Sequence, residues 1–405
     1  MMRHKVASLQ QHRNALYLSI FGIYLASVTL QTTTFNDMIP HRVGVLVELA
    51  TLAALLGLVV CLDALTLTQI IGEVSLLVLV TVVTLTSGAH YLMPTVMLVI
   101  GARHVSFRQI IQVYLGVVGT ILLVALVAAE AGLIKNITFT TADGLRQSFG
   151  VVYTTDFAAH IFYLCAAYLY LLARRFRPVA LLPVIIGLGI IYQFTKTMTD
   201  VIALVALVGV YLLYIYRRQL RWLRPMLRYS FLMLPIASGA IIGLSNVFNY
   251  QDRLLVMLNN ALSTRLALGN NALLAYGVKL FGQAPIPING WGGDRADSFT
   301  NGVGTATYFF IDSSFLNMLI SYGLLLTLVL IIGITWFLYQ RTRQHDYLLP
   351  VIFAAIAISS MFDQHFLEVT YNVFILMLFA DLPNYRTAVG PEFERPVVIQ
   401  RGASY

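Results

Sequence analysis

The chain has 405 residues, of which 59% are hydrophobic and only 11% are charged. This composition excludes a water-soluble globule, and the apolar runs recur along almost the whole length, which excludes a soluble domain with a single anchor. The net charge of +8 is spread over short segments without a nucleic-acid-binding module, so nucleic acid is not an expected partner. The sequence predicts an all-α, polytopic integral membrane protein.

Long apolar runs divide the chain into segments that could cross a bilayer. A crossing of about 30 Å of hydrocarbon takes about 20 helical residues, and on this basis we expect about 12 transmembrane helices. They fall at residues 15–35, 42–62, 69–87, 90–102, 108–131, 152–173, 178–194, 199–216, 226–247, 313–339, 347–362 and 366–382. Residues 1–14 are then a cytoplasmic N-terminus, 15–382 a single transmembrane domain and 383–405 a cytoplasmic tail.

The distribution of basic residues indicates which ends of these helices face the cytoplasm. With the N-terminus inside, most of the 26 Lys and Arg residues fall on the cytoplasmic side, as the positive-inside rule requires. The exceptions, on the outer side, are Arg42, Lys135, Arg146, Lys196, Arg253, Arg265, Lys279 and Arg295. The rule gives no reason for these side chains, so an anionic ligand is expected among them.

Two outer loops, at about 132–151 and 248–312, are longer than a compact bundle needs. Long loops of this kind commonly carry function. The second contains the amphipathic stretch "DRLLVMLNNALSTRLALGNNALLAYGVKLFGQ" and then the Gly-rich stretch "NGWGGDRADSFTNGVG". The pattern predicts an amphipathic helix on the outer face, followed by irregular chain.

The stretch "YFFIDSSFLNMLISYGLLL" places a carboxylate at the outer rim of an apolar segment. Asp312 could cap the following helix by accepting its first N–H groups, or it could take part in chemistry. Ser313, Tyr322 and Gly323 could contact a sugar or could serve helix packing, since glycine permits close approach.

Several of these motifs resemble those of Wzy-type bacterial polysaccharide polymerases. The stretches "LSTRLALGNNALLAYGVKLFGQAPI" and "FFIDSSFLNMLISYGLL" match at Arg265, Phe281-Gly282, Ile311-Asp312 and Tyr322-Gly323. The stretch "LRQSFGVVYTTDFAAHIF" is similar to the family's Arg-x-Ser-x-Gly motif and supplies Arg146, Ser148, Gly150 and Asp156, with Tyr153-Thr154-Thr155 where relatives have His-Pro-Asn. In "FTKTMTD", Lys196 stands where relatives have Arg.

The resemblance implies a GT-C-like glycosyltransferase architecture in the bacterial cytoplasmic membrane, with the active site facing outward. The implied reaction joins undecaprenyl-diphosphate-linked oligosaccharide repeat units into a capsule, exopolysaccharide or O-antigen. The implied partners are the lipid-linked donor and acceptor, membrane lipid, and flippase and chain-length regulator proteins. No cofactor is expected, and no metal either, because the acidic residues are scattered and no His-Glu-x-x-His motif occurs.

Charge grows on the diphosphate leaving group as the glycosidic bond breaks, so fixed cations are needed there. Arg146 and Arg265 are the expected diphosphate ligands because a guanidinium binds two phosphate oxygens at once, and Lys196 is a third candidate. The alternative is that these side chains only reach the lipid headgroups.

The acceptor hydroxyl needs a general base within reach. The candidates are the ionisable residues at outer helix ends: Asp312, His365, Glu368, Asp156 and His160, together with Asp363. Asp156 and His160 are four residues apart and share one helix face. A cap or an interhelical hydrogen bond is the alternative role for each residue.

Two other functions compete with polymerisation. A flippase or transporter of lipid-linked oligosaccharides would have a similar number of helices, but it would show two similar halves. A polysaccharide or O-antigen ligase would share the lipid-linked donor. Ligases tend to have a histidine in the large outer loop, and residues 248–312 contain none.

Overall fold

The computed structural model describes residues 2–63, 65–141, 144–173, 176–287 and 309–382. The first helices are α1 (Met2–Gln31), α2 (His41–Leu62), α3 (Leu67–Ser87), α4 (Leu92–Gly101), α5 (Phe107–Glu130), α6 (Thr154–Leu172), α7 (Leu182–Ile190) and α8 (Met198–Ile215). The later helices are α9 (Arg224–Arg228), α10 (Met233–Asn246), α11 (Arg253–Ala261), α12 (Arg265–Tyr276), α14 (Ser314–Asn317), α15 (Leu324–Arg343) and α16 (Leu348–Ser359).

Short elements join these helices. A two-stranded antiparallel hairpin precedes α6, formed by β1 (Thr138–Thr141) and β2 (Gly144–Gln147), with Phe139 opposite Arg146. π-helical turns occur at Ile191–Thr195 and Met318–Tyr322. The 3-10 helices are Thr34–Met38, Pro178–Leu181, Arg221–Leu223, Ser230–Leu232, His365–Leu367 and Val373–Leu378.

Within the described ranges, 8 helices are long and apolar enough to cross a membrane, or up to 9 if the bent pair α9–α10 is one span. The chain is therefore a mostly helical, polytopic membrane protein. The sequence-based count of about 12 is higher because it includes the short helices α4 and α16. It also includes residues 366–382, which the structure shows as turns and 3-10 helices instead of one long helix.

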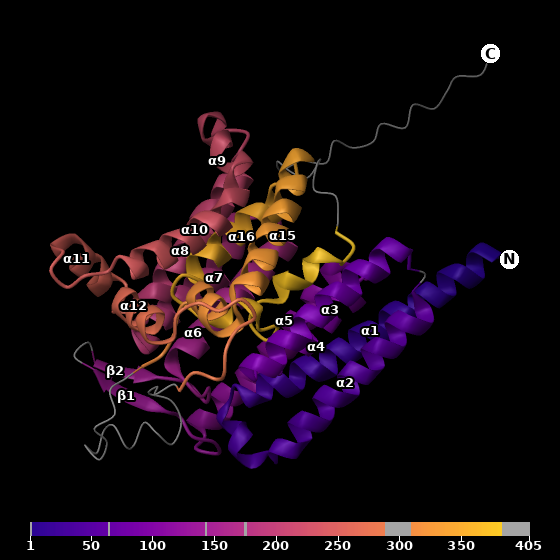
Figure 1. The fold of residues 1–405 in the computed structure, drawn as a ribbon, viewed down its shortest axis with the longest axis horizontal. Helices are drawn as coiled ribbons and strands as arrows, with labels where there is room; N and C mark the ends of the chain where they lie inside the picture. The colour runs from indigo at the N-terminus through magenta and orange to yellow at the C-terminus, as the bar shows by residue number, and fades with distance from the viewer. Residues whose placement is uncertain (1, 64, 142–143, 174–175, 288–308, 383–405) are drawn as a thin grey trace.

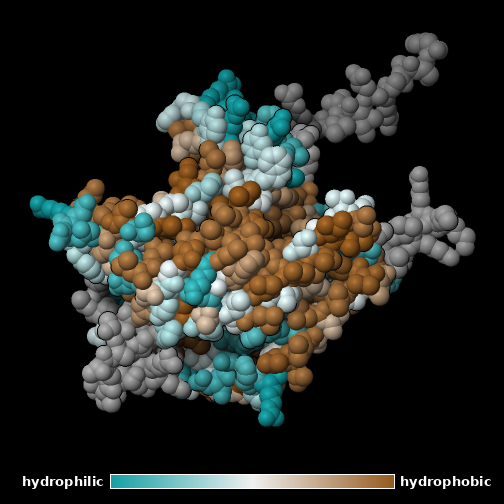
Figure 2. All heavy atoms as spheres, viewed as in Figure 1, coloured by the Kyte–Doolittle hydropathy of each residue, from teal (hydrophilic) through white to brown (hydrophobic). Residues whose placement is uncertain are grey.

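The molecular surface has the pattern expected of a bilayer protein. Hydrophobic side chains form a broad belt, with hydrophilic residues above and below it (Figure 2). Large apolar side chains on the outward faces of α2 and α3 are exposed, among them Leu46, Val60 and Leu85. Apolar side chains that would be unfavourable in water are stable against lipid tails.

The two ends of the bundle differ in charge and in the elements that they carry. One end holds α9 and the C-terminal end of α15 (Figure 1). Arg224 begins α9 and Arg341 lies in the last turn of α15, so we call it the arginine end. The opposite end holds the β1–β2 hairpin and α12, and we call it the hairpin end. Which end faces the cytoplasm is a prediction from the positive-inside rule.

The predicted amphipathic helix of the long loop is two helices. α11 and α12 are separated at Ser263 and Thr264, which both have positive φ. α12 packs against α10 and buries Leu266, so it belongs to the bundle and does not lie flat on a membrane surface. The Gly-rich stretch after it falls in residues 288–308 and lies outside the described residues, as do residues 383–405 of the predicted tail.

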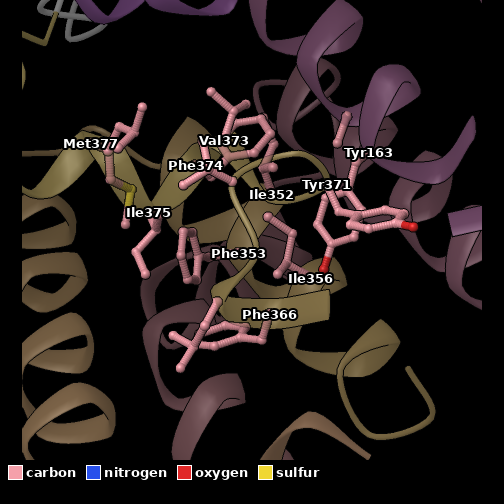
Figure 3. Close-up of a cluster of buried hydrophobic side chains, with 14 of the residues drawn as sticks. Tyr163, Ile352, Phe353, Ile356, Phe366, Tyr371, Val373, Phe374, Ile375 and Met377 are labelled. Atoms are coloured by element: carbon pink, nitrogen blue, oxygen red, sulfur yellow. The ribbon is translucent and has the colours of Figure 1, made fainter. Parts of the chain in front are cut away.

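The segment from Asp363 to Asp381 runs through the middle of the bundle. It packs against α4, α5 and α14, and side chains such as Phe366 and Phe374 lie in the core beside α16 (Figure 3). Near its end, its backbone pairs with the α4–α5 connection, where Phe107 N–H donates to the Asp381 carbonyl and Asp381 N–H donates to the Val105 carbonyl. Such backbone is tolerated at membrane depth only where it is buried in protein.

Two motif glycines meet where α14 and the π-helical turn give way to α15. Gly323 has φ 94°, and a Cβ there would lie 2.2 Å from the Gly282 nitrogen. The chain before Gly282 also caps α15, because the first N–H groups of that helix donate to the carbonyls of Lys279 and Leu280. Close backbone contact at this point thus explains both the Phe-Gly and the Tyr-Gly pairs.

Replacement of Gly323 by alanine should therefore destabilise the protein. Overpacking and the positive φ together should cost about 2–4 kcal/mol, seen as a lower melting temperature of the detergent-solubilised protein. Gly333→Ala, at an α15 position with no atom within 4 Å of the added Cβ, is the matched control and should melt like the wild type. Equal melting of the two variants would contradict the packing account.

Candidate functional site

His365 lies at the centre of a group of carboxylates near the hairpin end. Its Nε2 is 3.3 Å from Asp363 Oδ1 and 3.5 Å from Asp156 Oδ1, and its Nδ1 is 3.2 Å from Glu368 Oε2. α6 supplies Asp156, while the other three residues come from the buried C-terminal segment. Both ring nitrogens of His365 thus face carboxylates, and only 4% of its side chain is exposed.

Aromatic stacking fixes the orientation of the His365 ring. Tyr371 lies against it with ring centroids 3.6 Å apart, and His160 stacks on the other side of Tyr371 at 4.0 Å. His160 Nε2 is 3.0 Å from the Thr32 hydroxyl of the N-terminal helix. The stack leaves His160 fully buried and separated from the carboxylates, so its position is that of a packing residue.

The backbone around this group is held by side chains from four helices. The Ser314 hydroxyl donates to the Asp363 carbonyl and accepts from Phe366 N–H, and the Tyr114 hydroxyl donates to the Tyr371 carbonyl. Thr95 and Arg265 donate to two further carbonyls of the same segment. Buried carbonyls left unpaired would each cost several kcal/mol, so these bonds hold the carboxylate cluster in place.

Burial and mutual interaction set the protonation of the central pair. Burial opposes the charged imidazole, but Asp363, Glu368 and Asp156 outweigh it and raise the pKa of His365 well above its ordinary value. Burial raises the pKa of Asp363 to about 6, with His365 acting in the opposite direction. The physical consequence is a histidine that stays protonated at neutral pH among carboxylates.

Two further aspartates lie around this group. Burial raises the pKa of Asp312, while the Arg265 guanidinium favours its charged form. Asp312 accepts no hydrogen bond from any described residue, and α14 has Ser313 as its N-cap, so Asp312 does not take the cap role that was the alternative to a chemical one. Asp200, buried near the start of α8, interacts electrostatically with Asp363, Arg265 and His365.

Arg265 reaches this group from the first residue of α12. Its Nε donates to the Phe362 carbonyl at 2.7 Å. In the described part of the chain, its two terminal nitrogens have no hydrogen-bond partner. One edge of the guanidinium is therefore anchored and the other is available to a ligand with two oxygens.

Arg146 and Lys196 lie together on the hairpin side of the same region. Arg146 Nε donates to the Thr195 carbonyl at 2.8 Å, and Lys196 is the next residue. The Lys196 side chain also lies beside Gly144 of β2. The regular α-helix of α7 gives way to a π-helical turn, and Lys196, which follows the turn, has a positive φ. This irregular end brings Lys196 close to β2.

Tyr153 shows that the two arginines approach one region from different loops. Its hydroxyl interacts electrostatically with Arg146, Asp312, Asp156 and Arg265, and burial raises the pKa of Tyr153 to about 12. The structure thus brings together Asp156, Arg265, Asp312, His365 and Glu368, with Arg146 and Lys196 at the margin.

Ser313 and Gly323 make structural contacts. Ser313 is buried and its hydroxyl donates to the Ser360 carbonyl at 3.4 Å, while Gly323 forms the backbone contact with Gly282. The Tyr322 hydroxyl is 2.7 Å from the Tyr91 hydroxyl and interacts electrostatically with Glu368, a member of the carboxylate group around His365.

Sequence reasoning overlooked Asp200 and Tyr371. Asp200 ends the "FTKTMTD" motif and could have been singled out as an ionisable residue in an apolar run, whereas no sequence signal marks Tyr371 as a stacking partner. No group of His, Cys, Asp and Glu suited to a metal ion is found among the residues that the structure describes.

Comparisons with protein-family models, curated proteins and solved structures give no match to this chain. The geometry alone therefore defines the class: a polytopic helical membrane protein with a buried ionisable cluster and neighbouring arginines at one end of the bundle.

Protonation of His365 should appear in the pH dependence of stability. The pKa of His365 in the folded protein is raised above the unfolded value of about 6.5. The charged imidazole therefore stabilises the fold fully below the unfolded pKa, and this stabilisation is lost as the pH rises through the folded pKa. Removing one partner of a buried charge cluster costs about 3 kcal/mol. The melting temperature of His365→Gln should thus lie well below that of the wild type at pH 6, with a smaller difference at pH 9.

The control for this experiment is His41→Gln, since His41 is exposed at the start of α2. It should melt like the wild type at every pH. A difference between His365→Gln and the wild type that is the same from pH 5.5 to 9.5 would contradict a titrating His365.

Proposed function

We propose that this protein is a membrane glycosyltransferase that polymerises undecaprenyl-diphosphate-linked oligosaccharide repeat units on the outer face of the bacterial cytoplasmic membrane. The observation that carries the proposal is that Arg265, on α12, reaches the buried carboxylate cluster, while Arg146, on β2, lies at its margin. Cations for a diphosphate leaving group and carboxylates for an acceptor hydroxyl are the two requirements of glycosyl transfer from such a donor.

In the proposed reaction, an acceptor hydroxyl attacks the anomeric carbon of the donor sugar. The bond from that carbon to the diphosphate oxygen breaks, and its electron pair leaves with the lipid diphosphate. Arg265 binds two of the diphosphate oxygens, with Arg146 and Lys196 adding positive charge, and these contacts strengthen as the leaving group becomes more negative. The proton of the acceptor hydroxyl passes to a carboxylate.

Geometry favours Glu368 as that base, with Asp312 as the second candidate. Glu368 has the most exposed side chain of the carboxylates that contact His365, at 28% compared with 17% for Asp156 and 13% for Asp363. His365 is a poor base because both of its nitrogens already face carboxylates and it is held as a cation. In this proposal His365 orients the carboxylates and balances their charge.

The proposal includes a GT-C-like organisation, in which α4, α16 and the C-terminal segment lie within the membrane and bring the number of membrane-embedded segments to about 12. It also includes an outward-facing hairpin end, since the arginine end satisfies the positive-inside rule as the cytoplasmic side. Flippase and chain-length regulator proteins would work beside it in the same membrane.

Deletion of the gene tests the reaction class. Cells that lack the protein should display single repeat units and no high-mass polysaccharide, measured by gel electrophoresis of surface polysaccharide and mass spectrometry of lipid-linked intermediates. Loss of a flippase would instead leave repeat units on the inner leaflet, and loss of a ligase would leave long polymer on its lipid carrier. Normal polysaccharide length in the deletion strain would rule out the polymerase.

Arg265→Lys tests the diphosphate role. Lysine keeps the charge but loses the fork and the Nε bond to Phe362, so the rate of transfer from purified lipid-linked repeat units should fall by about a hundredfold, or about 2–3 kcal/mol. Arg253→Lys is the matched control, because Arg253 is exposed at the start of the adjacent α11. Wild-type turnover by Arg265→Lys would mean that the side chain only reaches the headgroups.

A further inference from the structure

A hollow lies beside the carboxylate cluster. It is a cavity of about 470 Å³ between the α3–α4 turn, the chain after α12 and the π-helical turn before α15. Tyr91, Pro285, Asn317 and Tyr322 are among the residues that line it. The volume falls within the range of about 300–1,000 Å³ that small-molecule sites occupy.

The lining combines apolar side chains, such as Pro285 and Ile311, with hydrogen-bonding groups and the imidazole of His90. The Tyr91 and Tyr322 hydroxyls are 2.7 Å apart, Asn317 Nδ2 donates to the Tyr322 hydroxyl at 3.3 Å, and the Ser321 hydroxyl donates to Asn317 Oδ1 at 2.7 Å. The two tyrosine rings meet edge to face with centroids 6.3 Å apart. None of the described residues that line the cavity has a carboxylate, ammonium or guanidinium group.

This chemistry fits a neutral sugar better than a phosphate or a lipid tail. A sugar ring offers an apolar C–H face to aromatic side chains, and its hydroxyls can both donate to and accept from tyrosine, asparagine and glutamine groups. A phosphate would require a cation. A lipid tail would make no use of the hydroxyl and amide groups in the lining.

The cavity adjoins the carboxylate cluster through two chain segments. Ile311 and Gln364 line it, and each is next in the chain to an aspartate of the cluster, Asp312 and Asp363. The Glu368 carboxylate interacts electrostatically with the hydroxyls of both Tyr91 and Tyr322, as well as with His365. Glu368 therefore stands at the boundary between the cavity and the cluster.

We propose that this cavity binds the non-reducing end sugar of the acceptor and presents its hydroxyl to Glu368. The inference rests on the proposed function for the identity of the acceptor, but binding itself does not depend on catalysis. Tyr91, Asn317 and Tyr322 then help to determine which sugar is accepted, while Arg265 acts on the donor alone.

Direct binding tests the cavity. The probe is the repeat-unit oligosaccharide, obtained from the host's surface polysaccharide by partial hydrolysis and titrated into the purified full chain in detergent with calorimetric detection. Tyr91→Phe and Asn317→Ala should each raise its dissociation constant by about tenfold, since each loses one hydrogen-bonding group at about 1.4 kcal/mol per tenfold change. Tyr250→Phe, an exposed tyrosine outside the cavity, should bind like the wild type.

Equal melting temperatures of all variants are required, so that weaker binding is not a folding effect. Unchanged affinity in both cavity variants, or no binding by the wild type at millimolar oligosaccharide, would overturn the assignment. Failure of the polymerase proposal gives a different result: the cavity variants still weaken binding, but no lipid-linked repeat units are joined by the wild type.

Discussion

Every feature of the site depends on one constraint: a non-helical segment in the middle of an apolar bundle needs hydrogen-bond partners for its own backbone. Between Phe362 and Tyr371, side chains of α4, α5, α12 and α14 supply those partners. Without them, each buried carbonyl would destabilise the fold by several kcal/mol. Because these bonds fix the segment, the side chains of Asp363, His365 and Glu368 are held where a regular helix could not place them together.

The same segment also balances the negative charge of the carboxylate cluster. A group of buried carboxylates would normally take up protons, yet a protonated His365 between them keeps part of the group ionised. The stacked Tyr371 prevents the imidazole from turning away. Arg265 donates to the carbonyl of Phe362, just before this segment, so in the proposed reaction the cation for the donor and the carboxylate for the acceptor share one rigid support. Such preorganisation is what electrostatic catalysis requires.

Sequence reasoning predicted the membrane class and singled out most of the ionisable residues that the structure brings together, because a charged group in an apolar run is unusual wherever it occurs. The sequence did not predict how these residues are arranged in space. Residues 366–382 are as apolar as a spanning helix, and hydropathy cannot distinguish contact with lipid from contact with protein. The motif glycines at 282 and 323 were visible, but their contact joins segments far apart in the chain. A cap role was open to Asp312 because the sequence does not show that the helix begins at Ser314, with Ser313 as its N-cap.

The central position of the C-terminal segment also has a consequence for biogenesis. The segment leaves the ribosome after every helix that surrounds it, so α1, α4, α5 and α6 enter the membrane before the chain that completes their packing exists. Until then the hydroxyls of Thr29, Thr95 and Tyr114 lack the partners that Thr370, Leu367 and Tyr371 later give them. Packing of the bundle core is therefore completed only after this segment has been synthesised.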